Sequence, residues 1–236
     1  WGANIKQEAK IFSPNSNKNC YEILYQNSLI PRGMGRSYGD SANFKNVLET
    51  KYLNHIIEFN KEEGIIKCES GLTIRQLLKL IIPFKWFVPV SPGTSLVTIG
   101  GAVASDVHGK NHHNVGSFSN FVIDFDIMLG NGDIINASRT KNIDLFYATC
   151  GGMGLTGLIL NITLKLRKIV SSFINQTSLK LSNLETLCEK FDKFSKNDYS
   201  VAWLDCLNLK QERLKSNFIY GNHCSVSEIE KIRFNT

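Results

Sequence analysis

The sequence contains no closely spaced cysteine pair. Zinc ribbons and thioredoxin-like redox centres both need paired cysteines, so both are excluded. We therefore predict reduced thiols, most of them buried in the core. The six cysteines lie far apart, at Cys20, Cys68, Cys150, Cys188, Cys206 and Cys224.

Long hydrophobic runs and dense basic clusters are also absent. A transmembrane helix needs about 18–20 apolar residues, whereas the longest apolar run, near residues 159–166, is interrupted by Asn161, Thr163 and Lys165. The net charge of +6 comes from basic residues scattered along the chain, which is typical of a solvated surface. We expect no transmembrane segment, no signal peptide and no nucleic-acid partner.

What the sequence does contain is the composition of a folded chain with a mixed order of helices and strands. Hydrophobic residues make up 42% of the 236 residues, so a substantial core is expected. Periodicity and turn signals predict helices over 17–28, 74–82, 141–149 and about 183–194, a hairpin over 121–137, and strands over 45–50, 53–59, 64–70, 88–90, 158–166, 171–181, 200–207 and 216–221. This irregular order indicates an α+β fold. Glycine becomes rare after Lys168, which predicts a domain boundary between residues 1–168 and 169–236.

A first glycine-rich loop, PRGMGRSYGDSA, occupies residues 31–42. Its spacing is G-x-G-x-x-x-G, so the third glycine comes one residue later than in the Rossmann fingerprint, and no amphipathic helix follows. A nicotinamide site of that kind is therefore disfavoured. Flanking arginines indicate an anion, which a nest of backbone N–H groups could bind. A tight turn without a ligand is the alternative.

Two further glycine-rich stretches follow, SPGTSLVTIGGAVASDVHGKNHH at 91–113 and GGMGLTG at 151–157. His108 and His112 have the i, i+4 spacing of a zinc helix, but no acidic residue accompanies them and Gly109 and Asn111 disfavour a helix. We predict no metal site, and interpret the histidines and Lys110 as facing a polar ligand, with a solvated loop as the alternative. Three such segments suggest one extended ligand touched at several points.

The motifs RGMGRSYGDSA, VPVSPGTSLVTIGGAVASDVHGKNHHNVGSF, DIMLGNGDI and DLFYATCGGMGLTGLI occur in this order. Together they resemble the PCMH-type FAD-binding domain of the vanillyl-alcohol oxidase family. Within it, they are most similar to the decaprenylphosphoryl-β-D-ribose oxidases, the flavin subunits of a 2-epimerase. The likeness runs from Trp1 to the segment 199–207 and covers only part of such an enzyme.

The resemblance implies a two-lobed α+β flavin domain followed by the beginning of an α+β substrate (cap) domain, with FAD between the lobes. It places His108, Lys110 and Tyr38 on the substrate side of the flavin and Trp203 in the wall of the substrate pocket. Arg36 stands where covalent relatives carry histidine, so non-covalent FAD is expected. The cofactor-binding residues it implies are Arg32, Gly33, Met34, Gly35, Arg36, Ser37, Tyr38, Gly39, Asp40, Ser41, Gly93, Thr98, Ile99, Gly100, Gly101, Ser105, Asp106, Val107, His108, Gly157, Leu158 and Ile159.

The resemblance also implies a reaction. A secondary hydroxyl of a polyprenylphosphoryl pentose, at ribose C2, would be oxidised by hydride transfer to flavin N5 while a base takes the hydroxyl proton. His108 is a candidate proton acceptor, with a purely positional role as the alternative. This would be the first half of a 2-epimerisation for cell-wall arabinan, with an NAD(P)H-dependent reductase as partner. Other substrate contacts, among them a lysine, would lie outside this chain.

Two other functions stay open. The sequence HGKNHH favours the sugar-lipid oxidases, since aldonolactone and alditol oxidases usually have H-G-[ST] at this position. A sugar, polyol or aldonolactone oxidase of the same fold is the first alternative, and a non-catalytic flavin-binding protein is the second. A lipid-linked substrate would require work at a membrane surface, so we expect a cytoplasmic or membrane-associated protein.

Overall fold

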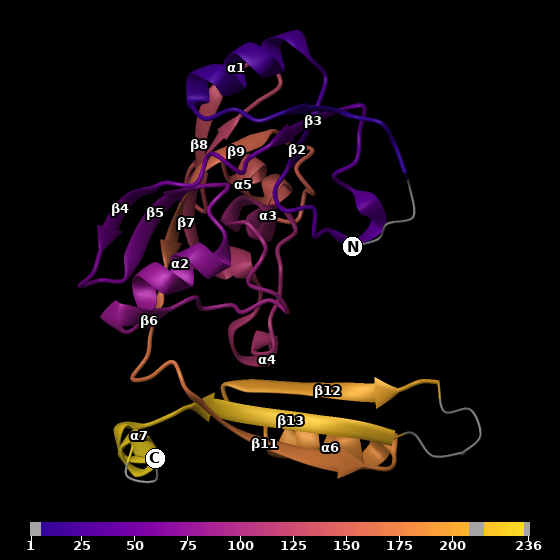
Figure 1. Cartoon of the computed structure of the whole chain (residues 1–236), viewed down its shortest axis with the longest axis vertical. Helices are drawn as coiled ribbons and strands as arrows, with labels where there is room; N and C mark the ends of the chain where they lie inside the picture. Colours follow the sequence, from indigo (N-terminus) through magenta and orange to yellow (C-terminus); the bar gives the residue numbers. More distant parts are fainter. Residues whose placement is uncertain (1–5, 208–214, 234–236) are drawn as a thin grey trace.

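The computed structural model describes residues 6–207 and 215–233, which form successive sheets along the chain (Figure 1). The first is a small parallel sheet of strand order β1-β3-β2, formed by Lys10–Phe12, Asn46–Glu49 and Ile30–Arg32. Helix α1 (Asn17–Gln26) connects β1 to β2, and the Ser16 side chain caps it by accepting a hydrogen bond from the Asn19 N–H. These elements form the first lobe.

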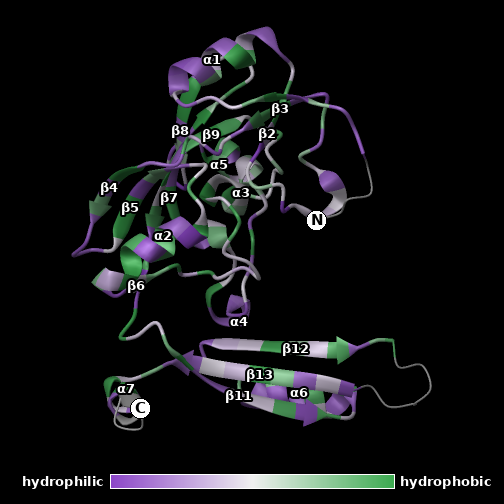
Figure 2. Cartoon of the chain, in the orientation of Figure 1, coloured by the Kyte–Doolittle hydropathy of each residue, from purple (hydrophilic) through white to green (hydrophobic). Residues whose placement is uncertain are grey.

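The second lobe is built on a five-stranded antiparallel sheet of order β4-β5-β9-β7-β8. Figure 2 shows hydrophobic residues gathered on its strands and hydrophilic residues on the short helix α4 (His112–Val115). The strands are β4 (Ile56–Asn60), β5 (Ile65–Glu69), β7 (Val122–Met128), β8 (Ile134–Ser138) and β9 (Leu158–Lys165).

Three helices pack against this sheet: α2 (Ile74–Ile81), α3 (Ile99–Ala104) and α5 (Ile143–Thr149). Their apolar residues, such as Leu77 and Phe146, are fully buried in one cluster with strand residues such as Ile162. Helix α2 begins at a capping box between Thr73 and Gln76, as its sequence pattern requires. The core of the second lobe therefore lies between the sheet and these helices.

The two lobes share a smaller apolar cluster. Cys20 of α1 and Leu48 of β3 pack with Leu53, and these meet Met128 and Leu160 of the large sheet. All five side chains are at most 1% exposed. This contact holds the two lobes together.

A third sheet, of order β11-β13-β12, follows the second lobe. It consists of β11 (Ile174–Leu181), β12 (Tyr199–Asp205) and β13 (Lys215–His223) and carries α6 (Leu184–Lys193). The Phe191 ring of α6 lies edge-on to Phe218, with 4.8 Å between ring centroids. Helix α7 (Val226–Arg233) comes last. The connection runs through a two-stranded pair, β6 (Trp86–Phe87) and β10 (Arg167–Lys168).

The α+β class is confirmed, as is the hairpin β7–β8, whereas several element boundaries were wrong. The expected strand over 88–90 lies two residues earlier, as β6, because Val88 and Val90 turn into the core. The expected strand over 53–59 begins only at Ile56. A 3-10 turn, Ile82–Phe84, follows α2 through Pro83. The domain boundary after Lys168 stays a prediction.

The cysteines only partly follow the sequence prediction. All six are free thiols, but only Cys20, Cys68 and Cys224 are buried, while Cys188 and Cys206 are exposed. Burial raises the pKa of the Cys68 thiol to about 12, which suits an inert core residue. Among residues 6–207 and 215–233, no helix is long and apolar enough to cross a membrane.

Candidate functional site

A cleft of about 540 Å³, including its open mouth, lies where the two lobes meet. One wall comes from the end of β2 and the loop after it, with Arg32 and Gly33, and the other from α3 and the start of β9. The fold thus forms a hollow between the glycine-rich segments.

The cleft brings together many of the residues predicted to bind a cofactor. All three glycine-rich segments contribute to it, as a single extended ligand requires. The predicted residues among its lining are Arg32, Gly33, Ser37, Ser41, Thr98, Gly100, Gly101, Ser105, Gly157, Leu158 and Ile159. The role of each residue stays a prediction.

Other predicted residues lie elsewhere. Gly35 and Asp40 line a second hollow of about 1220 Å³ on the N-terminal side of the same loop, which also shares Arg32 and Ser37 with the cleft. Ile99 is fully buried in the core. The predicted residues that line neither hollow are Met34, Arg36, Tyr38, Gly39, Gly93, Ile99, Asp106, Val107, His108, Lys110 and Trp203.

Three of these residues lie at distinct places outside the two hollows. Tyr38 is 84% exposed on the loop. The Asp106 carboxylate accepts hydrogen bonds from the Ser117 hydroxyl and the Ser119 N–H, so it fixes a turn. Trp203 lies on β12, 68% exposed, and lines a groove of the third sheet with Leu204.

The cleft also contains residues that the sequence analysis missed. Thr50 and Ser70 are buried, and Met153 and Gly154 belong to the third glycine-rich segment, of which only the end was predicted to bind. The glycine pattern could have indicated Gly154. Nothing in the sequence distinguishes Thr50 or Ser70 from small core residues. The full set of additional lining residues is Pro31, Ala42, Thr50, Ser70, Ala104, Met153 and Gly154.

The electrostatics of the cleft favour an anion. Among the described residues that line it, Arg32 is the one that carries a charge. Its Nη1 donates to Asn43 Oδ1 at 2.8 Å and to the Ala42 carbonyl at 3.3 Å, which leaves Nη2 and Nε as further donors. The backbone N–H groups of Gly33 and Gly35 donate to no described residue. These donors suit a diphosphate.

Helix α3 contributes space and not donors. The Gly100 N–H donates to the Ser70 carbonyl at 2.8 Å, and the Gly101 N–H donates to Thr98 Oγ1 at 3.1 Å. Because these amides are already bonded, the helix start offers no anion site. Its glycines instead allow close packing, since a Cβ at Gly100 would lie 2.7 Å from the Ser70 Cβ.

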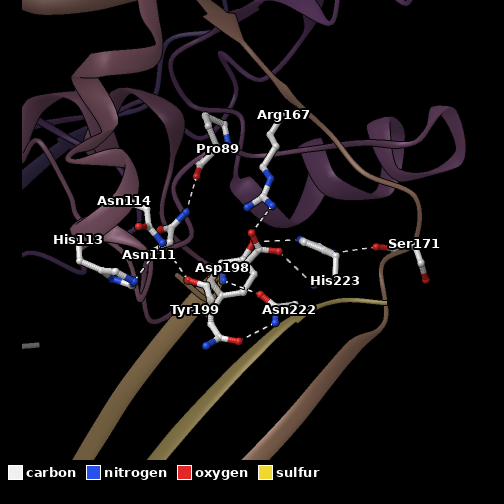
Figure 3. A network of polar contacts seen from close by, with 11 residues as sticks. Pro89, Asn111, His113, Asn114, Arg167, Ser171, Asp198, Tyr199, Asn222 and His223 are labelled. Atoms are coloured by element: carbon white, nitrogen blue, oxygen red, sulfur yellow. Dashed lines mark hydrogen bonds and ion pairs between the residues drawn. The ribbon is translucent and has the colours of Figure 1, made fainter. Parts of the chain in front are cut away.

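One loop that begins at the cleft also contacts the third sheet. Ser105 lines the cleft, and the residues after it form a loop that leads into α4. The carbonyl of Lys110 in this loop accepts a hydrogen bond from the Ser200 N–H of β12 at 2.8 Å, and Asn114 Nδ2 donates to the Asn197 carbonyl, also at 2.8 Å. Fully buried Asn111 anchors the loop by donating to the Pro89 carbonyl at 2.7 Å (Figure 3). The loop that carries His108 and Lys110 is thus held by both lobe and sheet, with both side chains exposed.

A polar network closes the junction on its other side. Arg167 of β10 forms an ion pair with Asp198, and Asp198 also accepts a hydrogen bond from the His223 N–H (Figure 3). His223 Nδ1 lies 2.7 Å from the Ser171 carbonyl, which makes Nδ1 the protonated nitrogen, and Nε2 lies 3.0 Å from the Tyr199 hydroxyl. A neutral imidazole satisfies both contacts, because Nε2 then accepts the hydroxyl proton.

We expect this histidine to make the protein less stable in mild acid. Burial, aided by nearby Arg167, lowers the pKa of His223 below its ordinary value of 6.5. The unfolded chain therefore binds a proton more readily, and stability falls as the pH drops below 6.5. The urea midpoint should decrease from pH 7.5 to pH 5.5, and less so for His223→Gln. Equal decreases in the two proteins would contradict this role.

The histidine rings of the loop lie close to one another. His108 and His112 lie edge-on, with 5.8 Å between ring centroids, as do His112 and His113. Within the described part of the chain, no group of three or more histidine, cysteine or acidic residues is placed to hold a metal ion.

The residues of the cleft fit FAD. A single arginine with a glycine-rich loop suits its diphosphate, and the small residues of α3 leave room for flat ring contacts. The Ser70 hydroxyl is buried in the lining without a partner among the described residues, which suits a polar ligand atom there. This architecture defines a flavin-binding domain formed from two lobes.

Comparison with known proteins agrees. The family described as "FAD binding domain" matches residues 18–138, and the chain belongs to this family. It is 38% identical over 185 residues to the decaprenylphosphoryl-beta-D-ribose oxidase of Mycolicibacterium smegmatis, covering 76% of this chain and 40% of that protein. It is also 23% identical over 176 residues to the Delta(24)-sterol reductase of Mus musculus, covering 75% of this chain and 31% of that enzyme. A third relative is the probable L-gulonolactone oxidase 4 of Arabidopsis thaliana, 26% identical over 136 residues, covering 55% of this chain and 24% of that protein.

The chain spans at most two fifths of the length of these relatives. The predicted FAD cofactor is confirmed at the level of the domain.

Proposed function

We propose that the whole protein is an FAD-dependent oxidoreductase that oxidises a secondary hydroxyl, at ribose C2, of a polyprenylphosphoryl pentose. Support comes from the 38% identity to an oxidase named for such a substrate. It also comes from the loop of His108 and Lys110, which runs from the cleft to the third sheet. This bridging loop is the observation that carries the proposal.

The chain's own residues have distinct tasks in this proposal. Arg32 and the loop after it hold the cofactor diphosphate, and the small residues of α3 admit the ring. Bound FAD would supply the two-electron acceptor for the hydride that leaves the sugar carbon. His108 either accepts the hydroxyl proton or orients the sugar, and Lys110 offers a cation to the polar substrate.

A reductase that uses NAD(P)H would then reduce the ketone from the opposite side and complete a 2-epimerisation. Such a pair would serve cell-wall arabinan synthesis and work at a membrane surface, because the substrate carries a lipid. We further propose non-covalent FAD, since Arg36 occupies the position of the histidine of covalent relatives.

A sugar, polyol or aldonolactone oxidase is the second candidate. The 26% identity to a probable L-gulonolactone oxidase supports it. The two candidates share the cofactor site and differ in whether the sugar carries a phosphoryl lipid.

Anaerobic single-turnover assays of the whole protein separate the candidates. With a polyprenylphosphoryl ribose we expect bleaching of the flavin absorbance and a product lighter by two hydrogens. With L-gulonolactone or free ribose we expect neither. Acid precipitation of the same sample should leave the FAD in the supernatant. Oxidation of the free sugars alone would favour the second candidate, and no oxidation by a FAD-loaded sample would leave only a binding protein.

A further inference from the structure

Ser70 occupies the point where three elements meet at the cleft. It follows the last residue of β5, its N–H donates to the Leu160 carbonyl of β9 at 2.8 Å, and its carbonyl accepts from the Gly100 N–H of α3. The backbone of Ser70 is therefore fully bonded within the second lobe.

The hydroxyl of Ser70 is different. The residue is 2% exposed, and its Oγ has no hydrogen-bond partner among the described residues. Most buried polar atoms in proteins are hydrogen-bonded, because an unpartnered hydroxyl loses its hydration without compensation. Thr98, which lines the same cleft, follows this rule, since its Oγ1 accepts the Gly101 N–H.

Helix α3 also packs closely against Ser70. A Cβ at position 100 would lie 2.7 Å from the Ser70 Cβ and 3.0 Å from its carbonyl oxygen, so only glycine allows α3 to approach this closely. Gly100 and Ser70 both line the cleft. A ligand that reaches this part of the cleft therefore lies next to Ser70.

We propose that the Ser70 hydroxyl is a binding group for FAD at the floor of the cleft, where it forms a hydrogen bond with a polar group of the cofactor. The inference rests on the placement of FAD in this cleft and on no property of the substrate. Apo protein carries the cost of the unpartnered hydroxyl, and the cofactor removes it.

The proposal predicts that one substitution stabilises the apo protein and weakens its binding of FAD. Ser70→Ala should raise the melting temperature of the apo protein by about 2–4 °C, because the unpartnered hydroxyl is gone. The same change should raise the FAD dissociation constant by about 3- to 10-fold, measured by quenching of flavin fluorescence. Replacing a residue with only a packing role would not stabilise the apo protein while weakening its binding of FAD.

Ser216→Ala is the matched control. Ser216 is also buried with an unpartnered hydroxyl, but it lies on β13 and lines the groove of the third sheet. Its replacement should stabilise the apo protein and leave the FAD dissociation constant unchanged. If Ser70→Ala binds FAD within about twofold of the parent protein, a water or nothing satisfies the hydroxyl and the proposal is wrong. Ser70→Cys, nearly isosteric but a weak donor, should show a smaller loss of the same sign.

These assays need no substrate. A protein that binds FAD less tightly after Ser70→Ala but oxidises no sugar lipid would confirm this inference and overturn the proposed reaction. The reverse result would overturn only the inference.

Discussion

Arg32→Ala should weaken FAD binding by about 10- to 100-fold. Charge-assisted hydrogen bonds are worth about 1.5–3 kcal/mol, and every 1.4 kcal/mol corresponds to about tenfold in affinity. Arg32 is the one charged residue among the described lining of the cleft, and it also lines the hollow on the other side of the loop. No other lining side chain can replace its charge. Fluorescence titration of the apo protein with FAD measures the effect.

The same side chain also fastens the glycine-rich loop, so the loss of charge must be separated from the loss of the tether. Asn43→Ala removes the partner of the 2.8 Å bond to Arg32 Nη1 and keeps the charge. We expect this variant to lose about fivefold or less in affinity, because the charge stays in the cleft and only one bond that holds the loop is removed. Arg32→Lys keeps a charge without the planar fork and should lie between wild type and Arg32→Ala.

Salt provides an independent readout. Attraction between the guanidinium and a diphosphate is screened by ions, so the FAD affinity of the parent protein should fall with salt concentration. The affinity of Arg32→Ala should depend on salt less. If the salt dependence is the same in both proteins, Arg32 acts only through the loop.

The predicted and the missed parts of the cleft differ for a physical reason. Glycine patterns report backbone requirements directly, and so the segments at 31–42, 91–113 and 151–157 could be found in the sequence. Ser70 and Thr50 are small residues at the ends of strands, where burial is ordinary. Only the three-dimensional arrangement shows that the Ser70 hydroxyl lacks a partner and that Ser70 lines a cleft.

The sequence analysis missed elements whose sequence pattern is too short or is interrupted by glycine. Strands β1 and β2 have three residues each, too few for a period of two to be visible. Helix α3 was hidden because its two glycines disfavour a helix, whereas Thr98 caps it by accepting the Gly101 N–H. Tertiary contacts with Ser70 and Leu72 decide the conformation there.

Gly71→Ala should strongly destabilise the protein. A Cβ at this position would lie 1.8 Å from the Thr50 carbonyl oxygen and 2.7 Å from that of Leu53. Both are backbone atoms, so the movement of a side chain cannot relieve the clash. The Gly71 N–H also donates to the Leu53 carbonyl at 2.7 Å, a bond that the displaced turn would lose.

The turn at residues 50–53 matters because it joins the lobes. Leu53 is 1% exposed in the cluster that holds them together, and Thr50 lines the cleft. Displacing the turn should cost about 4 kcal/mol or more, the size reserved for disrupted cores. For a chain of this size that corresponds to roughly 10 °C in melting temperature. Gly130→Ala is the control, because nothing lies within 4 Å of its Cβ, and it should stay within about 0.5 kcal/mol of wild type. If the Gly71→Ala protein melts within about 2 °C of the control, the turn can be displaced without a large loss of stability and the prediction is wrong.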